Sequence, residues 1–181
     1  AIGSFHAVCS RGGLLRHIPS GTYAIREAVS YDIEHPPFGE HASSLGPVIA
    51  WSIAKEANIP AYLVDPVSVD EMQPLARVSG LKGMERESFF HALNQKAVAR
   101  KAAADLGKPY ESLNLIVVHM GGGVSVAAHE KGREVDVYNV RDEGSVSLDR
   151  AGSLPVNAVV NLCFSGISKQ EIKRKLSFES G

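Results

Sequence analysis

The chain has 181 residues, of which 44% are apolar and 22% are charged, and its formal net charge is −1. This composition is typical of a globular protein with one sizeable core or two small linked units. There is no basic excess that would favour nucleic acid, and no run approaches the ~18 apolar residues that a membrane span needs. Because the chain opens without a basic leader, the sequence predicts a cytoplasmic protein.

The first third of the chain alternates short apolar runs with turns. We expect a strand over residues 4–9, a sharp turn over 10–13 and a loop over 19–23. Helices are predicted over 24–33 and 47–57, and in the second of these Val48, Ile49 and Ile53 follow helical spacing. Residues 61–64 read as a buried strand that ends at Asp65 and Pro66. This order of elements favours an α/β fold with a mainly buried sheet.

The rest of the chain carries a longer helix and a group of strands. Residues 67–84 are predicted to be irregular, and a helix is predicted over 86–106, with Phe90, Leu93 and Ala97 on one face and Gly107 as its stop signal. Three strands should follow over 115–118, 124–128 and 134–138. A polar loop over 139–153 precedes helices over 155–163 and 168–176, the latter with Ser168 and Glu171 in a capping-box pattern.

Cysteine usage gives a further expectation. Cys9 and Cys163 are far apart, form no CxxC pair and lie in apolar surroundings. Buried free thiols in a reducing compartment are the default interpretation of that pattern.

The turn formed by Gly121, Gly122 and Gly123 is the most informative stretch, because it joins two predicted strands. Without a Cβ, three glycines can bring several backbone N–H groups close to one ligand, and such a concavity suits an anion such as phosphate. The Lys-Ser/Thr of a Walker loop is missing, and a strand rather than a helix follows. The alternative is a plain hairpin whose glycines are needed for positive φ.

Several side chains are candidates to act beside this turn, and each has a plain structural alternative. His119 ends the preceding strand, while Arg11 and Arg150 stand beside glycines in loops, where guanidinium forks suit carboxylates and phosphates. His41 precedes a predicted helix, and Asp65 ends a buried strand, a favoured active-site position in α/β folds. The alternatives are a core histidine, solvated arginines, a polar residue at a helix start and an Asx-turn aspartate. No set of His, Cys, Asp and Glu has zinc-ligand spacing.

Taken together, these stretches resemble the butyrate kinases of the acetokinase family, within the sugar-kinase, Hsp70 and actin superfamily. The resemblance is strongest over residues 117–129, VVHMGGGVSVAAH, which look like the phosphate-binding hairpin of that family. It extends in the same order over SRGGLL, IPSGTY, GEHAS, IPAYLVDP, FHALNQKAVAR and DRAGSLP. It therefore spans nearly the whole chain.

The resemblance implies a fold and an activity. The fold is a two-domain α/β fold of the actin, Hsp70 and sugar-kinase type (ribonuclease H-like), with residues 1–66 ending the first domain on the acyl-substrate side and residues 67–181 starting the second. The activity is phosphoryl transfer from ATP, with Mg²⁺, to a short-chain carboxylate such as butyrate or a branched relative. The intact protein is expected to be at least a dimer that acts in fatty acid metabolism.

The resemblance also implies roles for single residues. His41 resembles the histidine that contacts the transferring phosphoryl group, and Arg150 resembles the arginine that stabilises the transition state. Asp65 resembles the catalytic aspartate near the metal and phosphates. Arg11 resembles a residue on the acyl-substrate side. The nucleotide-phosphate loop is implied to consist of His119, Gly121, Gly122, Gly123 and Ser125.

Two other functions stay open on the sequence. The family's opening strand with its first phosphate loop, and its adenosine-binding segment, have no counterpart here, which predicts a central fragment that is incomplete for catalysis. An isolated phosphate- or nucleotide-binding module without turnover is therefore the main alternative. A metal-dependent hydrolase using His119 and His129 is a more distant one, because this pair straddles a turn without a carboxylate in register.

Overall fold

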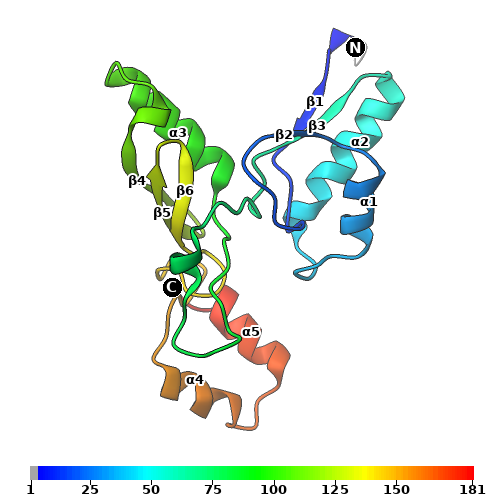
Figure 1. The fold of residues 1–181 in the computed structure, drawn as a ribbon. Coiled ribbons are helices and arrows are strands. Elements are labelled where there is room, and N and C mark those ends of the chain that lie inside the picture. The colour runs from blue at the N-terminus through cyan, green and yellow to red at the C-terminus, as the bar shows by residue number, and fades with distance from the viewer. Residues whose placement is uncertain (1–3) are drawn as a thin grey trace.

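In the computed structural model, which describes residues 4–181, two three-stranded sheets form separate arms (Figure 1). The first sheet has the order β1-β3-β2 and consists of β1 (Val8–Ser10), β3 (Ala61–Val64) and β2 (Thr22–Ala24). β1 is parallel to β3, and β2 is antiparallel to it. The strand predicted over 61–64 is confirmed, whereas β2 lies in a stretch predicted to be a loop.

Helices α1 (Glu27–Glu34) and α2 (Leu45–Ala57) accompany this sheet, and α2 packs on β1 and β3. The helix predicted over 47–57 is confirmed, but its buried face is not the predicted one. Val48, Ile49 and Ile53 are exposed, while Ala50 and Ala54 are 3% and 1% exposed. Small side chains let the helix approach the sheet closely, so the larger apolar residues, with Trp51 at 40% exposure, face outward.

The segment that joins the two sheets has little regular structure beyond a short 3₁₀ helix, Pro74–Arg77, and leads to α3 (Ala92–Asp105). The helix predicted from residue 86 therefore begins six residues later. Phe89 and Phe90 are fully buried in extended chain instead, where Phe90 N donates to Val67 O (3.2 Å) and Phe89 O accepts from Val140 N (3.0 Å). These bonds to distant segments compete with helix formation and stop it from starting earlier.

The second sheet is the predicted meander of β4 (Asn114–Met120), β5 (Val124–Glu130) and β6 (Arg133–Tyr138). All its pairs are antiparallel, and the order is β4-β5-β6, with an irregularity between Ala128 and His129. α3 packs along β4. Its buried face carries Ala92, Gln95, Lys96, Ala99 and Ala103, whereas Leu93 and Ala97, predicted to share a face, are exposed.

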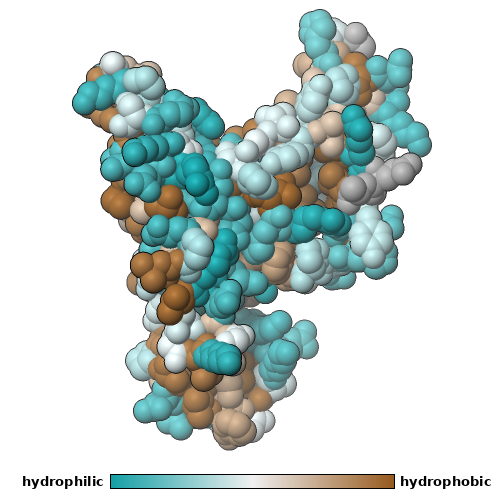
Figure 2. Space-filling view, viewed as in Figure 1, coloured by the Kyte–Doolittle hydropathy of each residue, from teal (hydrophilic) through white to brown (hydrophobic). Residues whose placement is uncertain are grey.

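The chain ends in α4 (Val156–Cys163) and α5 (Lys169–Phe178), which lie below the second sheet (Figure 1). Ser168 is confirmed as the N-cap of α5, because its Oγ accepts from Glu171 N at 3.2 Å. Apolar side chains gather on the surface of this lower part (Figure 2), and Val156 and Phe164 are 76% and 85% exposed. No helix within residues 4–181 is long and apolar enough to cross a membrane.

The prediction of buried thiols is wrong. Cys9 and Cys163 are free, as expected, but both are exposed. Cys9 is the middle residue of a three-residue strand whose neighbours point the other way, and α4 has no buried residue among those described. Apolar neighbours in the sequence did not mean apolar neighbours in space.

Candidate functional site

The glycine turn joins β4 to β5, and other side chains pack closely against it. None of Gly121, Gly122 and Gly123 has a positive φ. A Cβ on Gly122 would lie 2.7 Å from Asp149 Oδ2, and one on Gly123 would lie 2.7 Å from Val140 Cγ2. The alternative of a plain hairpin that needs positive φ is therefore wrong, because the turn is kept bare by what packs against it.

The predicted loop over 139–153 is what packs there. Ser147 Oγ donates to the carbonyl of Gly122 at 2.7 Å, and Arg150 Nη1 donates to the carbonyl of Val140 at 2.9 Å. The loop thus folds back over the turn, and the bond to Val140 holds the guanidinium of Arg150. The guanidinium has further N–H groups beyond the one that Val140 accepts.

Two histidines stack beside the turn. His119 ends β4, and its ring lies on that of His91, with ring centroids 3.6 Å apart and an interplanar angle of 8°. Asn94 Nδ2 lies 2.9 Å from His119 Nδ1. A Cβ on Gly121 would lie 3.3 Å from His119 Nε2, and one on Gly123 would lie 3.6 Å from His91 Cε1. Both rings therefore border the turn.

Sequence reasoning missed His91. It occupies the N-cap of α3, and it was hidden because the helix was expected to start at residue 86. The signal that would have found it is the position of a histidine directly before a helix that follows two buried aromatic residues. The structure thus adds His91, together with Asn94 one turn along α3, to the predicted set.

Ser125 follows the turn on β5, directly across from His119 in the strand register. Its side chain is 1% exposed and points inward, where Oγ lies 2.8 Å from His91 Nδ1 and 2.9 Å from Gln95 Nε2. The predicted contact between Ser125 and phosphate stays a prediction. What the structure gives this hydroxyl is a bond to His91.

Arg11 and His41 reach the site from the first sheet. Arg11 follows β1 and is exposed, and next to it the backbone of Gly13 lies against Ser44, where a Cβ would meet Ser44 Cα at 2.5 Å. His41 is the N-cap of a short 3₁₀ helix, Ala42–Ser44, and its Nδ1 accepts from Ser43 N at 3.1 Å. The contact of Gly13 with Ser44 brings the segments that carry Arg11 and His41 together.

The pKa shifts of the histidines show which of these residues are close enough to influence one another electrostatically. Burial lowers the pKa of His91 to about 4, and the positive charges of His119, Arg11 and Arg150 contribute to this shift. Burial also lowers the pKa of His41, helped by Arg150 and Arg11, and that of His119, helped by Arg11. Arg11, His41, His91, His119 and Arg150 therefore form one electrostatic group, with neutral imidazoles and cationic guanidiniums. Such a group attracts anions.

The polar contacts of Asp65 involve none of these five residues. It ends β3 with φ 37° and is 4% exposed, and its Oδ1 accepts from Ser20 Oγ and Gly21 N, each at 2.8 Å. Its Oδ2 lies 4.0 Å from Arg100 Nη1. Arg100 is nine residues beyond His91 on α3, about 13 Å along a helix that rises ~1.5 Å per residue. The carboxylate thus anchors the loop at residues 20–21.

The described residues contain no group of three or more His, Cys, Asp and Glu that would hold a metal ion. His129 offers no metal ligand, because Nδ1 lies 2.6 Å from Tyr110 OH and Nε2 lies 3.2 Å from Gln95 Oε1. The hydrolase hypothesis built on His119 and His129 is therefore wrong.

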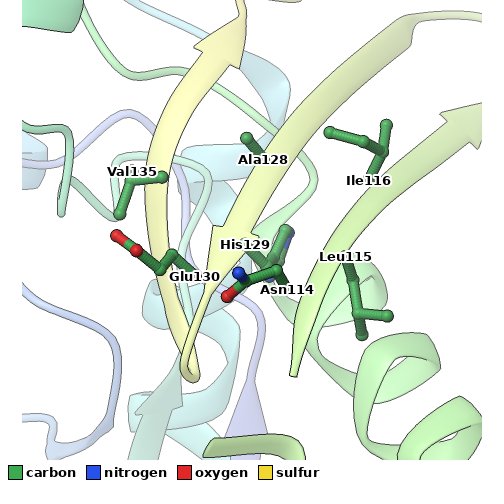
Figure 3. A pocket seen from close by; sticks show the side chains of 7 residues that line it. All are labelled: Asn114, Leu115, Ile116, Ala128, His129, Glu130 and Val135. Carbon is green, nitrogen blue, oxygen red and sulfur yellow. The ribbon is translucent and has the colours of Figure 1, made fainter. Parts of the chain in front are cut away.

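A pocket of about 280 Å³ lies at the other end of the hairpin (Figure 3). It is lined from all three strands, mainly by apolar side chains such as Leu115 and Ile116 on β4 and Val135 on β6. It is not lined by Arg11, His41, Asp65, His119, Arg150 or the glycine turn, whereas His129 does line it. The glycine turn and its histidines, rather than this pocket, form the candidate functional site.

The fold of this chain is similar to that of solved acetate and propionate kinases. The structure of Porphyromonas gingivalis acetate kinase matches with a TM-score of 0.78 and 23% identity, over 98% of this chain and 47% of that one. Francisella tularensis propionate kinase (TM-score 0.65, 18% identity) matches over 93% and 48%, and Entamoeba histolytica acetate kinase (TM-score 0.70, 14% identity) over 96% and 47%. The predicted actin-like α/β fold is confirmed, and the chain spans about half the length of these structures.

The family follows from the sequence itself. The model of the acetokinase family matches residues 78–181, which is more than half of the 181-residue chain. The chain belongs to the acetokinase family. The matched region includes α3, the glycine turn and Arg150.

Proposed function

We propose that this chain belongs to a phosphotransferase that moves the γ-phosphoryl group of ATP to the carboxylate of a short-chain acid. A carboxylate oxygen forms a bond to the γ-phosphorus, the bond between that phosphorus and the β–γ bridging oxygen breaks, and the products are an acyl phosphate and ADP. The observation that carries this proposal is the glycine turn with His91 and His119 stacked beside it and Arg150 held next to it, and with Arg11 and His41 in electrostatic contact with these residues.

The chemistry fits such a group. Phosphoryl transfer needs charge neutralisation and in-line positioning more than it needs covalent help. Arg150, held beside the turn through Val140, is the residue we assign to the charge of the transferring group. Arg11 is assigned to the carboxylate substrate and His41 to the phosphoryl group. A short-chain acid is ionised at neutral pH, so the reaction needs no general base.

The glycine turn is assigned to the phosphates of the nucleotide. The N–H of Gly121 donates to the carbonyl of Gly123 at 3.1 Å within the turn. The amides of Gly122 and Gly123, with His119 and His91 beside them, are therefore the groups that we assign to phosphate oxygens. Backbone amides of this kind are typical phosphate ligands.

The proposed cofactor is Mg²⁺, which neutralises charge on the phosphates when it is bound. Mg²⁺ in such sites takes one or two carboxylates from the protein and its other ligands from phosphates and water. Asp65 fits this requirement through Oδ2 alone, because Oδ1 is occupied by Ser20 and Gly21. Arg100 Nη1 lies 4.0 Å from this oxygen, so Oδ2 faces a positive charge but has no short hydrogen bond to it.

Butyrate or a branched relative is the proposed acceptor, and its support is the likeness of residues 117–129 to butyrate kinases. The matched structures are acetate and propionate kinases, so chain length is the property to test. The domain division near Pro66, a dimeric state and a cytoplasmic location stay predictions of the same kind.

The test is ATP-dependent acyl hydroxamate formation with acetate, propionate, butyrate and isobutyrate. It is run on the 181-residue chain and on the complete product of the gene that encodes it. We expect the complete product to form hydroxamate fastest with butyrate or isobutyrate. Faster reaction with acetate would overturn the proposed acceptor, and ATP binding without hydroxamate from any acid would favour the alternative of a binding module.

A further inference from the structure

A chain of buried hydrogen bonds leads from the candidate site into the core, and it starts at Ser125. Its Oγ receives Gln95 Nε2 at 2.9 Å and the backbone N–H of His91 at 3.3 Å. A hydroxyl has two lone pairs and one hydrogen, so these two donors fill its accepting capacity. Its hydrogen is then directed at His91 Nδ1, 2.8 Å away. His91 Nδ1 therefore accepts, and the neutral ring carries its proton on Nε2.

The orientation of Gln95 supports this direction. Its Nε2 also lies 3.1 Å from the carbonyl oxygen of Ser125, which can only accept, so the amide nitrogen must be on this side. The opposite end, Oε1, then accepts from His129 Nε2 at 3.2 Å. His129 Nδ1 is left as an acceptor for the hydroxyl of Tyr110 at 2.6 Å.

Because these side chains are buried, their hydrogen bonds can have only one set of directions. Gln95 is 0% exposed, Ser125 and His129 are each 1% exposed, and Tyr110 is 4% exposed, so protein groups rather than bulk water are their partners. Every donor from Tyr110 to His91 meets an acceptor, and reversing one bond would require reversing all of them. Burial lowers the pKa of His129 to about 4, with the charge of Lys96 adding to the effect, so its ring is neutral as the chain requires.

The series of hydrogen bonds ends at His91, beside the glycine turn. A Cβ on Gly123 would lie 3.8 Å from His91 Nε2, so this nitrogen borders the surface that we assign to phosphate. An Nε2–H donates to an anionic oxygen, whereas a ring protonated on Nδ1 would present a lone pair and repel it. The tautomer of His91 thus decides whether the ring attracts or repels phosphate.

We propose that Gln95, with Ser125 and His129, is a positioning residue that holds His91 in its Nε2–H tautomer and so aims a hydrogen-bond donor at the phosphate. This assignment rests on the proposed kinase function, but the tautomer itself does not. Gln95 lies on the buried side of α3 and acts only through Ser125. If the hydrogen bonds of Gln95 only stabilised the fold, replacing Gln95 would not change the tautomer of His91.

The variant that tests this is Gln95→Met, which keeps length and helix propensity but removes the amide. It frees one lone pair of Ser125 Oγ, so this oxygen can accept from His91 Nδ1 as well as donate to it. The readout is ¹⁵N NMR of the complete gene product with ¹⁵N-labelled histidine, because each ring nitrogen reports whether it carries a proton. Gln73→Met, an exposed glutamine given the same change, is the matched control.

We expect His91 to carry its proton on Nε2 in the wild type and in Gln73→Met, and to show both tautomers in Gln95→Met. In the same variant, kcat for acyl phosphate formation should fall roughly 10- to 100-fold, the range seen when partners that orient histidine ligands are removed. KM for the carboxylate should stay unchanged, since Gln95 does not touch that substrate. Ala99→Gly weakens α3 but removes none of these hydrogen bonds, so the tautomer of His91 should stay as in the wild type.

Three results would overturn the proposal: a wild-type His91 protonated on Nδ1, an unchanged tautomer in Gln95→Met, or an unchanged kcat beside a mixed tautomer. If Gln95→Met does not fold, Ser125→Ala decides the matter, because it removes the donor to His91 Nδ1 while keeping the backbone of β5. If the wild type forms no acyl phosphate, the proposed kinase function fails, and the NMR arm still decides whether Gln95 sets the tautomer.

Discussion

Glu134 on β6 gives the sharpest prediction about stability. It is 0% exposed, its Oε2 accepts from Glu71 N at 3.2 Å, and its Oε1 has no hydrogen-bond partner among the described residues. The nearby Lys96 bonds Glu71 Oε2 at 2.6 Å instead. Ser88 Oγ also lies 3.4 Å from Oε2, but it has one hydrogen, which makes the shorter 2.8 Å bond to the carbonyl of Val69. These surroundings favour the protonated carboxyl.

The magnitude follows from the pKa. Burial raises the pKa of Glu134 from 4.5 to about 7, and the charges of Asp70 and Glu71 contribute. Because the folded-state pKa is raised, this group stabilises the fold fully below pH 4.5, and that stabilisation is lost as the pH rises through 7. At about 1.4 kcal/mol for each pH unit between the two pKa values, the loss is on the order of 3 kcal/mol.

Glu134→Gln removes this titration while keeping the shape of the protonated carboxyl. We expect the variant and the wild type to have similar free energies of unfolding at pH 5, and the variant to be more stable by about 2–3 kcal/mol at pH 8. The measurement is urea unfolding followed by far-ultraviolet circular dichroism at pH 5, 6, 7 and 8. Differences between the two proteins cancel the contributions of titrating histidines that both share.

Glu130→Gln is the matched control, because Glu130 is exposed on the neighbouring strand and solvated in both states. Its effect on the free energy of unfolding should be small and the same at pH 5 and pH 8. A difference between Glu134→Gln and the wild type that does not change with pH would refute the reasoning, since it would mean that Glu134 has the same proton affinity in the folded and unfolded chain.

Three further changes test the site. Arg150→Ala should lower acyl phosphate formation by at least ~100-fold without changing circular dichroism, because it removes a donor to developing charge. Gly123→Ala should lower the free energy of unfolding by roughly 1–3 kcal/mol, since the added methyl overlaps Val140. Asp65→Ala should destabilise by roughly 1–3 kcal/mol, because Ser20 loses its acceptor, whereas Asp65→Asn keeps an acceptor and should lower Mg²⁺-dependent activity alone.

Each of these changes has a control. Arg150→Lys keeps the charge but not the guanidinium fork, so activity equal to the wild type would argue against a role for the fork. Gly80→Ala meets nothing within 4 Å and should have no effect, so equal losses in Gly80→Ala and Gly123→Ala would contradict the packing argument. Wild-type Mg²⁺ dependence in Asp65→Asn would remove Asp65 from the metal site.

Much of the fold could be predicted, because its signals are local. The meander over residues 114–138, the strand over 61–64 and the cap at Ser168 depend on alternation, turn chemistry and a single side chain. The buried face of α2 could not be predicted from the same pattern. Close packing favoured Ala50 and Ala54 over the larger apolar residues, and that choice depends on the distance between helix and sheet.

Most of the candidate site residues could also be predicted, but His91 could not. Residues beside glycines stood out in the sequence, and the structure groups Arg11, His41, His119 and Arg150 electrostatically. His91 joins them only because distant backbone bonds delay the start of α3. Its tautomer depends on four side chains from three elements, Gln95 on α3, Ser125 and His129 on β5, and Tyr110, and no local pattern reveals this arrangement.

The position of Trp51 has a practical consequence for spectroscopy. It is the sole tryptophan of the chain and lies on the outward side of α2, 40% exposed, beside the first sheet. Its emission therefore reports on the arm that holds Arg11 and His41, and is blind to the meander that holds the glycine turn. Fluorescence and circular dichroism followed in one titration would show whether the two arms melt together, and a shift in emission on adding ATP would show that nucleotide binding affects the first arm.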